Sequence, residues 1–225
     1  MTPKTLLFDM DGTLLDSTAA VVDAVAAGLV RAYAEHGLSP VASDRGLIAR
    51  CMGLATHIYF EQAFDSTTVP DGLRAEFALS YARFTAEEEV AVIARGETRL
   101  YEGVAEVLTA LQNRGHTLML FSNAGDTYFD AIVQGHGLSR WFSRTLCVEQ
   151  ARRNGLAADK NEMVGLMIDD PAQTVVVGDR VHDIDAGRHA GARTVGCLYG
   201  FGDPAEFEAA DWTIATPLDL LDLPF

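Results

Sequence analysis

The stretch TLLFDMDGT, residues 5–13, decides how this chain folds. Its first part, residues 5–8, is a short apolar run of the kind that forms a buried strand. The run ends at once in Asp9, Asp11 and Gly12, which indicate a turn. A carboxylate two residues before another, with glycine next, lets one side chain point into a site while the turn returns the second beside it. Alone, this pattern is also typical of a solvated loop or a helix cap.

Beyond residue 97 the sequence alternates between strand and helix patterns. Alternation of this kind predicts an α/β fold, in which a Rossmann-like, doubly wound parallel sheet carries helices on both faces. Ligands of such sheets bind at the carboxyl ends of the strands. The predicted strands cover 117–121, 145–148, 174–177, 192–197 and 210–214, and the predicted helices cover 127–136, 160–168, 182–189 and 218–221, after a first helix that begins near 104.

The stretch between the first strand and this alternation is helical in pattern. Helices are predicted over 17–36, 45–51, 57–64 and 73–94, with no convincing strand among them. We therefore expect a core domain formed by residues 1–16 and 97–225, with a helical domain, residues 17–96, inserted into it.

Composition excludes several classes of protein. The 225 residues are 48% apolar, which is enough for a sizeable core, and the net charge is −15. A chain this acidic repels nucleic acid and anionic membranes and favours metal cations. The three cysteines are far apart and read as reduced core thiols. No apolar run approaches the roughly 20 residues of a membrane span, so a cytoplasmic location is expected. Oligomeric state is not indicated.

Polar residues also follow two later predicted strands. Ser122 and Asn123 end one strand, where a hydroxyl and nearby backbone N–H groups suit an anion. Asp179 and Asp183, four residues apart after another strand, offer the hard oxygen ligands that Mg²⁺ prefers. Asp183 is equally consistent with capping the following helix.

Lys160 stands at the start of a predicted helix. The chain has only one other lysine, Lys4, while 15 arginines carry the remaining positive charge, so Lys160 is not one of many interchangeable surface lysines. Its ammonium suits a phosphate oxygen. A solvated lysine at a helix start is the alternative.

Together these motifs resemble the haloacid dehalogenase-like hydrolase superfamily, in particular its phosphoglycolate phosphatase-like members with a small helical cap. The resemblance covers nearly the whole chain and rests on order and rough spacing. The matching motifs are residues 8–14, residues 121–123, Lys160, and residues 177–179 with Asp183. The inserted helical domain would be the cap.

The resemblance implies a role for each motif residue. Asp9 would attack phosphorus and form an aspartyl-phosphate, and Asp11 would act as general acid and then general base. Ser122, Asn123 and Lys160 would bind the phosphoryl group. Mg²⁺ would be held by the Asp9 carboxylate, the Asp11 backbone carbonyl, Asp179 and Asp183. The expected substrate is a small phosphorylated metabolite, a phosphomonoester.

The same residues help to distinguish phosphate-ester hydrolysis from other reactions of the superfamily. A dehalogenase of this type lacks the second aspartate, which is present here as Asp11. A phosphonate hydrolase needs a cap lysine, and no lysine lies between Lys4 and Lys160. A phosphomutase and a non-catalytic phosphoester-binding module remain as alternatives. In the inserted domain, Arg50, Met52 and Gly53 are the candidates for contacting the leaving group, although Arg50 could also simply face solvent.

Overall fold

The computed structural model describes residues 3–54 and 62–224. The chain divides into two compact units. The first comprises Met1–Asp16 and Arg99–Phe225, and the second comprises Ser17–Thr98. The chain thus leaves the first unit soon after its first strand and returns to it after residue 98.

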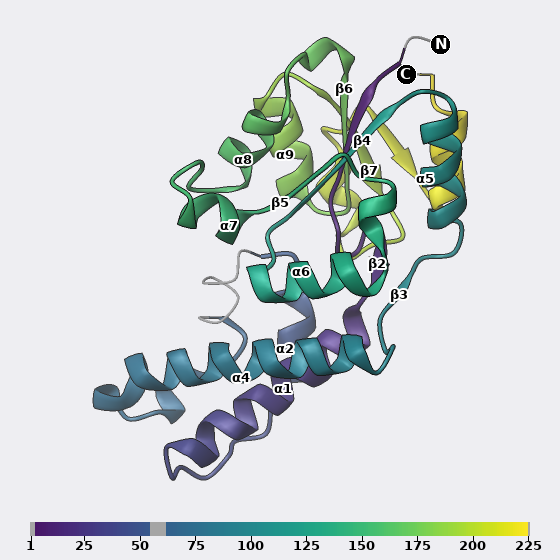
Figure 1. Cartoon of the computed structure of the whole chain (residues 1–225). Helices are drawn as coiled ribbons and strands as arrows, with labels where there is room; N and C mark the ends of the chain where they lie inside the picture. Colours follow the sequence, from purple (N-terminus) through teal and green to yellow (C-terminus); the bar gives the residue numbers. More distant parts are fainter. Residues whose placement is uncertain (1–2, 55–61, 225) are drawn as a thin grey trace. The chain divides into compact units, whose positions relative to one another are not determined.

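A six-stranded sheet forms the centre of the first unit, in the order β5-β4-β1-β6-β7-β8 (Figure 1). All neighbouring strands pair in parallel, which confirms the predicted doubly wound α/β sheet. The chain builds outward from β1 first on one side and then on the other, so the strand order reverses beside β1. The strands are β1 (Thr5–Phe8), β4 (Thr117–Ser122), β5 (Arg144–Cys147), β6 (Thr174–Gly178), β7 (Arg193–Cys197) and β8 (Trp212–Ile214).

The register of the three central strands brings their carboxyl ends level. Phe8, the last residue of β1, pairs with Leu120 of β4 and with Val177 of β6. Asp9, the next residue, therefore lies at the carboxyl end of β1, close to the ends of both neighbouring strands. Residues that follow β1, β4 and β6 in sequence meet at one edge of the sheet, where parallel α/β proteins bind ligands.

Helices cover both faces of this sheet. Successive residues of a strand point to opposite faces, so neighbouring residues of one strand pack against different helices. Leu7 and Val176 pack in one core cluster with α7, α8 and α9. On the other side Phe8 and Val177 line a small apolar space together with Val104 and other residues of α5. The helices are α5 (Val104–Asn113), α6 (Asp126–Gly135), α7 (Val148–Arg153), α8 (Lys160–Met167) and α9 (Val181–His189).

Several local features differ from the sequence-based expectation. Helix α7 begins at Val148, directly after β5, where the pattern predicted only the end of a strand. The helix predicted over 218–221 is present as a 3₁₀ helix, Pro217–Asp222. An unpredicted ribbon pairs β2 (Leu15–Asp16) antiparallel with β3 (Arg99–Leu100). The ribbon joins the points where the chain leaves and re-enters the first unit.

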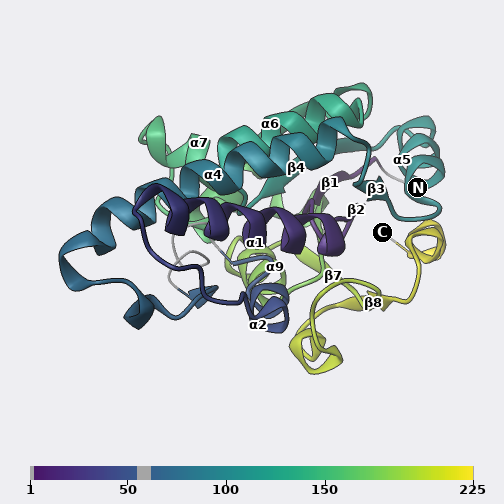
Figure 2. The same ribbon diagram turned by 90° about the horizontal axis from the view of Figure 1, so that it is seen from below.

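The described part of the second unit contains helices and 3₁₀ turns: α1 (Thr18–Glu35), α2 (Arg45–Arg50), α4 (Arg74–Ala94), Ser66–Thr68 and Asp71–Leu73. Helices α1 and α4 lie side by side (Figure 2). They approach closely where Gly28 faces Thr85, since a Cβ at Gly28 would overlap the Thr85 side chain. Tyr33 and Phe77 meet edge to face at 4.9 Å between ring centroids. The helix predicted over 57–64 lies largely outside the described residues.

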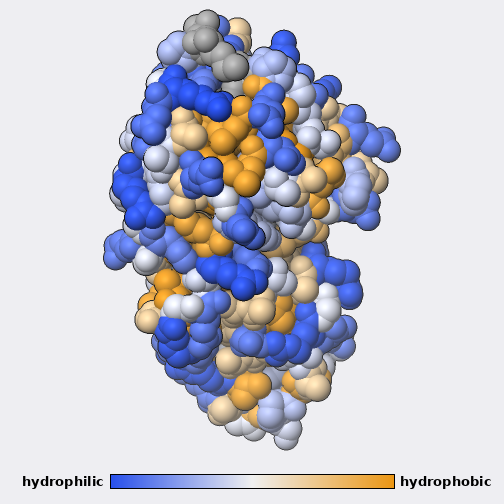
Figure 3. Space-filling model, turned by 90° about the vertical axis from the view of Figure 1, so that its right-hand side faces the viewer, coloured by the Kyte–Doolittle hydropathy of each residue, from blue (hydrophilic) through white to orange (hydrophobic). Residues whose placement is uncertain are grey.

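Exposed apolar side chains are scattered over the surface. Figure 3 shows one face, on which hydrophobic patches alternate with hydrophilic residues. Among the described residues, the most exposed large hydrophobic side chain is Leu79, at 74%. Within the same residues, no helix combines the length and apolar character needed to cross a membrane. Cys51, Cys147 and Cys197 are all buried, as expected for core thiols.

Leu7→Ala tests the core beneath the site. Leu7 is fully buried in the central strand, so its truncation should leave a cavity and lower the free energy of unfolding by about 2–5 kcal/mol. Urea unfolding measures this change. Leu166→Ala is the matched control in the same unit, because Leu166 is 45% exposed and its loss should cost no more than about 0.5 kcal/mol. Equal effects of the two changes would contradict the assigned core.

Candidate active site

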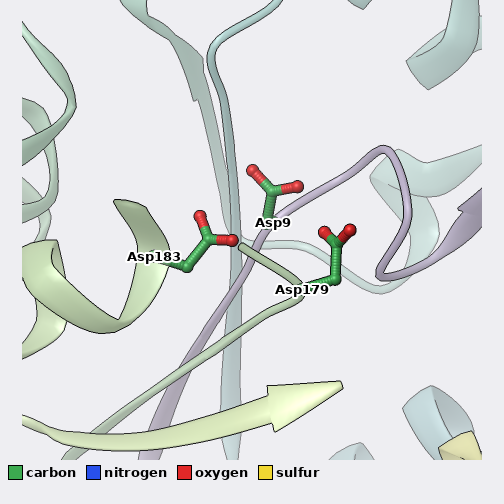
Figure 4. Close-up of side chains that lie close together, drawn as sticks. All are labelled: Asp9, Asp179 and Asp183. Carbon is green, nitrogen blue, oxygen red and sulfur yellow. The ribbon is translucent and has the colours of Figure 1, made fainter. Parts of the chain in front are cut away.

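Three carboxylates converge where the strand order reverses. Asp9 follows β1, Asp179 follows β6, and Asp183 lies in the first turn of α9 (Figure 4). One carboxylate oxygen from each lies within 4.8 Å of the others. All three are buried: Asp9 is 6% exposed, and Asp179 and Asp183 are 0% exposed. The predicted proximity of these residues is therefore found in the structure.

Lys160 is the ammonium that faces this cluster. Its Nζ donates a hydrogen bond to Asp9 Oδ1 at 2.7 Å and lies 2.5 Å from Asp183 Oδ1. Its side chain is only 8% exposed and its Nζ lies 4.9 Å from the ring centroid of Phe121. The alternative of a solvated lysine at a helix start is therefore wrong.

Asp179 is fixed by hydrogen bonds to both of its oxygens. Thr13 Oγ1 donates to Oδ1 at 3.0 Å, and the backbone N–H of Phe201 donates to Oδ2 at 2.8 Å. Glycines make room for this carboxylate. A Cβ at Gly12 would overlap the carboxylate itself, and one at Gly200 would overlap Asp179 Cβ and the Gly12 carbonyl oxygen. Gly12 also has a φ of 84°, which glycine adopts readily.

Asp183 combines both of its sequence-based interpretations. Its Oδ2 accepts a hydrogen bond from the backbone N–H of Arg180 at 2.9 Å, which caps the start of α9. Its Oδ1 forms an ion pair with Lys160 and, among the residues that the structure describes, accepts no hydrogen bond of good geometry. Capping thus orients the carboxylate without removing it from the cluster. Gly178 permits this approach, since a Cβ there would overlap Asp183.

Burial dominates the electrostatics of the cluster. It raises the pKa of Asp9 well above its ordinary value; Lys160 opposes this shift, while Asp183 and Asp179 add to it. Burial, followed by the charge of Asp183, raises the pKa of Asp179 to about 7. For Lys160, burial acts to lower the pKa, but Asp183 and Asp9 outweigh it and the pKa rises. One ammonium therefore does not balance three carboxylates.

The donor set fits a divalent cation. Carboxylate oxygens are the hard ligands that ions such as Mg²⁺ take, and the buried cluster has surplus negative charge. Asp183 Oδ1 also has no hydrogen bond of its own within the described residues. A bound cation would oppose the raised pKa values of Asp9 and Asp179, because its positive charge favours the ionised carboxylates.

Asp11 lies beside the cluster, and its carboxylate is not part of it. The carboxylate accepts a hydrogen bond from the hydroxyl of Tyr128 at 2.6 Å. The turn around Asp11 is closed by the backbone N–H of Gly12, which donates to the carbonyl of Leu15 at 2.9 Å. A carboxylate outside a metal cluster remains available for proton transfer.

Ser122 and Asn123 follow at the end of β4, and both are buried. The hydroxyl of Ser122 accepts a hydrogen bond from the backbone N–H of Ala124 at 3.0 Å. A hydroxyl that accepts in this way can still donate its own hydrogen to an anion. The candidate phosphate-binding residues are thus placed on the strand next to Asp9.

The three candidates in the inserted unit lie at the end of α2 and in the turn after it. Arg50 is exposed and Met52 is buried. Gly53 has a φ of 83°, which makes it a turn residue. Their contact with a leaving group stays a prediction.

Two contacts of the site were not predicted. Tyr128 and Phe201 carry no motif of their own, and Phe201 acts through its backbone N–H, which every residue except proline offers. Only the small residues Gly200 and Gly202 on either side of Phe201 hinted at a close backbone approach.

The sheet, with an acidic cluster at the point where its strand order reverses, is a Rossmann-like α/β fold with a candidate active site. The chain belongs to the haloacid dehalogenase-like hydrolase family, which it matches over residues 3–191. The N-acetylmuramic acid 6-phosphate phosphatase of Pseudomonas aeruginosa is 29% identical, over 98% of this chain and 94% of that protein. The phosphoglycolate phosphatase of Agrobacterium fabrum is 29% identical, over 88% and 81% respectively.

The fold is shared with solved structures. A haloacid dehalogenase-like family protein from Streptococcus pneumoniae superimposes with a TM-score of 0.75 at 20% identity, over 99% of both chains. The family match and the phosphoglycolate phosphatase relative confirm the resemblance found in the sequence motifs. The family and the phosphatase relatives also confirm the prediction that the chain is a phosphoric monoester hydrolase.

Gly200→Ala tests the packing around Asp179. The added methyl group should displace Asp179 or the Gly12 turn, and overpacking of this kind should cost about 1–3 kcal/mol of unfolding free energy. Urea unfolding in the presence of a chelator measures it. Gly165→Ala is the control, because Gly165 lies in α8 with open space around it and alanine favours a helix. If Gly200→Ala were as stable as Gly165→Ala, the close approach would be wrong.

Proposed function

We propose that this chain is a Mg²⁺-dependent phosphatase that hydrolyses a small phosphomonoester through an aspartyl-phosphate on Asp9. The observation that carries this proposal is the buried carboxylate of Asp9, held 2.7 Å from Lys160 beside Asp179 and Asp183. A bound cation beside Lys160 would favour the ionised form of this buried carboxylate, and an ionised carboxylate is suited to nucleophilic attack.

The proposed reaction has two displacements. In the first, a carboxylate oxygen of Asp9 attacks phosphorus, the ester P–O bond breaks, and Asp11 gives its proton to the departing alcohol. In the second, Asp11 takes a proton from water as the water oxygen attacks phosphorus. The Asp9–phosphorus bond then breaks and inorganic phosphate leaves. Each proton that Asp11 gives is thus recovered within the cycle.

The remaining residues hold the transferring group. Lys160, Ser122 and Asn123 would bind the phosphoryl oxygens, since phosphoryl transfer depends mostly on positioning and on neutralising charge. Mg²⁺ would be held by the carboxylates of Asp9, Asp179 and Asp183 and by the backbone carbonyl of Asp11. When bound, it supplies positive charge to the phosphoryl oxygens.

The substrate class follows from the relatives. N-acetylmuramic acid 6-phosphate and phosphoglycolate, the compounds in the names of two relatives, are small phosphate esters that also carry a carboxylate. We propose a substrate of this class. The unit of residues 17–96 would act as a cap that reads the leaving group, with Arg50, Met52 and Gly53 as the candidates. The exposed guanidinium of Arg50 would suit a carboxylate.

Phosphate release from a substrate panel tests the reaction. The panel contains N-acetylmuramic acid 6-phosphate, phosphoglycolate, hexose phosphates and nucleoside monophosphates, each with Mg²⁺ or with a chelator. Activity should require Mg²⁺, and Asp9→Asn should lower it by a factor on the order of 10³ or more, because the nucleophile is lost. Asp185→Asn is the control, since Asp185 is exposed on the same helix as Asp183.

Two results would contradict the proposal. Full activity of Asp9→Asn would exclude the aspartyl-phosphate. Absence of phosphate release from every panel member would exclude a phosphatase of this substrate class. Transfer of phosphate between positions of a sugar phosphate would then indicate a phosphomutase, and binding without turnover would indicate a phosphoester-binding module.

Stability measured against pH tests the metal site. The unfolded chain ionises its aspartates near pH 4, whereas the pKa of Asp179 is about 7 in the metal-free fold and that of Asp9 is also raised. These groups should therefore make the metal-free protein less stable as pH rises from about 4 to about 7. Protons compete with the cation below about pH 7, where Asp179 is protonated, so Mg²⁺ should raise the thermal midpoint more at about pH 8 than at about pH 5.5. An equal rise at both values would contradict the metal site.

A further inference from the structure

The contact between Tyr128 and Asp11 links two parts of the first unit that lie far apart in sequence. The Tyr128 hydroxyl lies 2.6 Å from Asp11 Oδ1, and the two residues are 117 positions apart. Tyr128 is the third residue of α6 and is 5% exposed. A buried tyrosine hydroxyl normally has a partner, and here that partner is the carboxylate next to the acidic cluster.

We propose that Tyr128 is a positioning residue, which holds the carboxylate of Asp11 in the orientation from which it exchanges protons with the leaving alcohol and with water. This inference rests on the proposed function, in which Asp11 is the general acid and base. The hydroxyl of Tyr128 donates to Oδ1 and thereby fixes the rotation of the carboxyl group about its Cβ–Cγ bond. Oδ1 can accept this bond whether the carboxyl group is protonated or ionised. One contact therefore serves both displacements.

The start of helix α6, which carries Tyr128, is held in place by contacts with α7. Helix α6 begins at Asp126, shortly after Ser122, the last residue of β4, and Asn123. The first N–H of this helix, that of Asp126, donates to Glu149 Oε2 of α7 at 2.8 Å, and Arg153 of α7 pairs with the Asp126 carboxylate. The start of α6 is thus anchored at both its backbone and its side chain. The segment that carries the candidate phosphate-binding residues also sets the orientation of Asp11.

Tyr128→Phe removes the hydroxyl and keeps the buried ring. Its effect on catalysis should depend on the leaving group. An alkoxide is strongly basic and needs a proton as it departs, whereas 4-nitrophenolate is a weak base and leaves without one. The value of kcat/KM covers the steps through the first displacement, in which Asp11 acts as the acid. A misplaced Asp11 should therefore lower kcat/KM for an alkyl phosphate far more than for 4-nitrophenyl phosphate.

The experiment compares both substrates with Mg²⁺ for the wild type, Tyr128→Phe, Asp11→Asn and Tyr33→Phe. The alkyl phosphate is the best substrate of the panel. Tyr128→Phe should lower kcat/KM for it by about 10-fold or more, and for 4-nitrophenyl phosphate by less than about 3-fold. Tyr33→Phe is the matched control, because it removes a hydroxyl that pairs with Thr68 in the inserted unit. Thermal midpoints of both tyrosine variants should stay within a few degrees of the wild type.

The outcomes separate this inference from the proposed function. Suppose that Asp11→Asn is inactive on the alkyl phosphate, as the proposed function requires. The positioning role would then be overturned if Tyr128→Phe kept its activity, gained activity, or lost equal activity on both substrates. An inactive wild type, or full activity of Asp11→Asn, would instead overturn the proposed function.

Discussion

The site depends on keeping three carboxylates and one ammonium together out of water. Burying like charges is strongly unfavourable unless each is paired or hydrogen-bonded, and Lys160 offsets only part of the repulsion between Asp9 and Asp183. Further stabilisation comes from hydrogen bonds. The Thr13 hydroxyl and the backbone N–H of Phe201 donate to Asp179, and the backbone N–H of Arg180 donates to Asp183. These donors lie in the loops after β1, β6 and β7, and the parallel sheet brings these loops together at one edge.

Glycines are the steric counterpart of this electrostatic arrangement. Gly12, Gly178 and Gly200 stand where a Cβ would occupy the space of an aspartate side chain. A polar site packed this closely has few alternative arrangements, which limits the reorganisation needed when charge develops during a reaction. The same closeness means that the loops cannot shift independently. Asp179, for example, touches the turn after β1 and the loop after β7 at once.

Much of this architecture could be predicted from the sequence. Short apolar runs alternating with helices gave the parallel sheet, and the polar residues at strand ends gave Asp9, Asp179 and Asp183. Lys160 stood out because lysine is so rare in the chain. The rest depends on contacts that no local pattern records. Helix α7 follows β5 without a turn residue, and the pairing of Tyr128 with Asp11 requires the final register of the sheet. Which residues of the insertion read a substrate also has no local signature.

The two-stranded ribbon of β2 and β3 bears on how long the insertion can be. It holds the outgoing and returning chain side by side, through the pairs of Leu15 with Leu100 and of Asp16 with Arg99. The insertion between these pairs is therefore equivalent to one long loop whose two ends are held together. The entropic cost of closing a loop grows only slowly with its length. A longer or shorter insertion therefore costs the first unit little free energy, and the strand ends that carry Asp9 and Asp179 need not move to accommodate it.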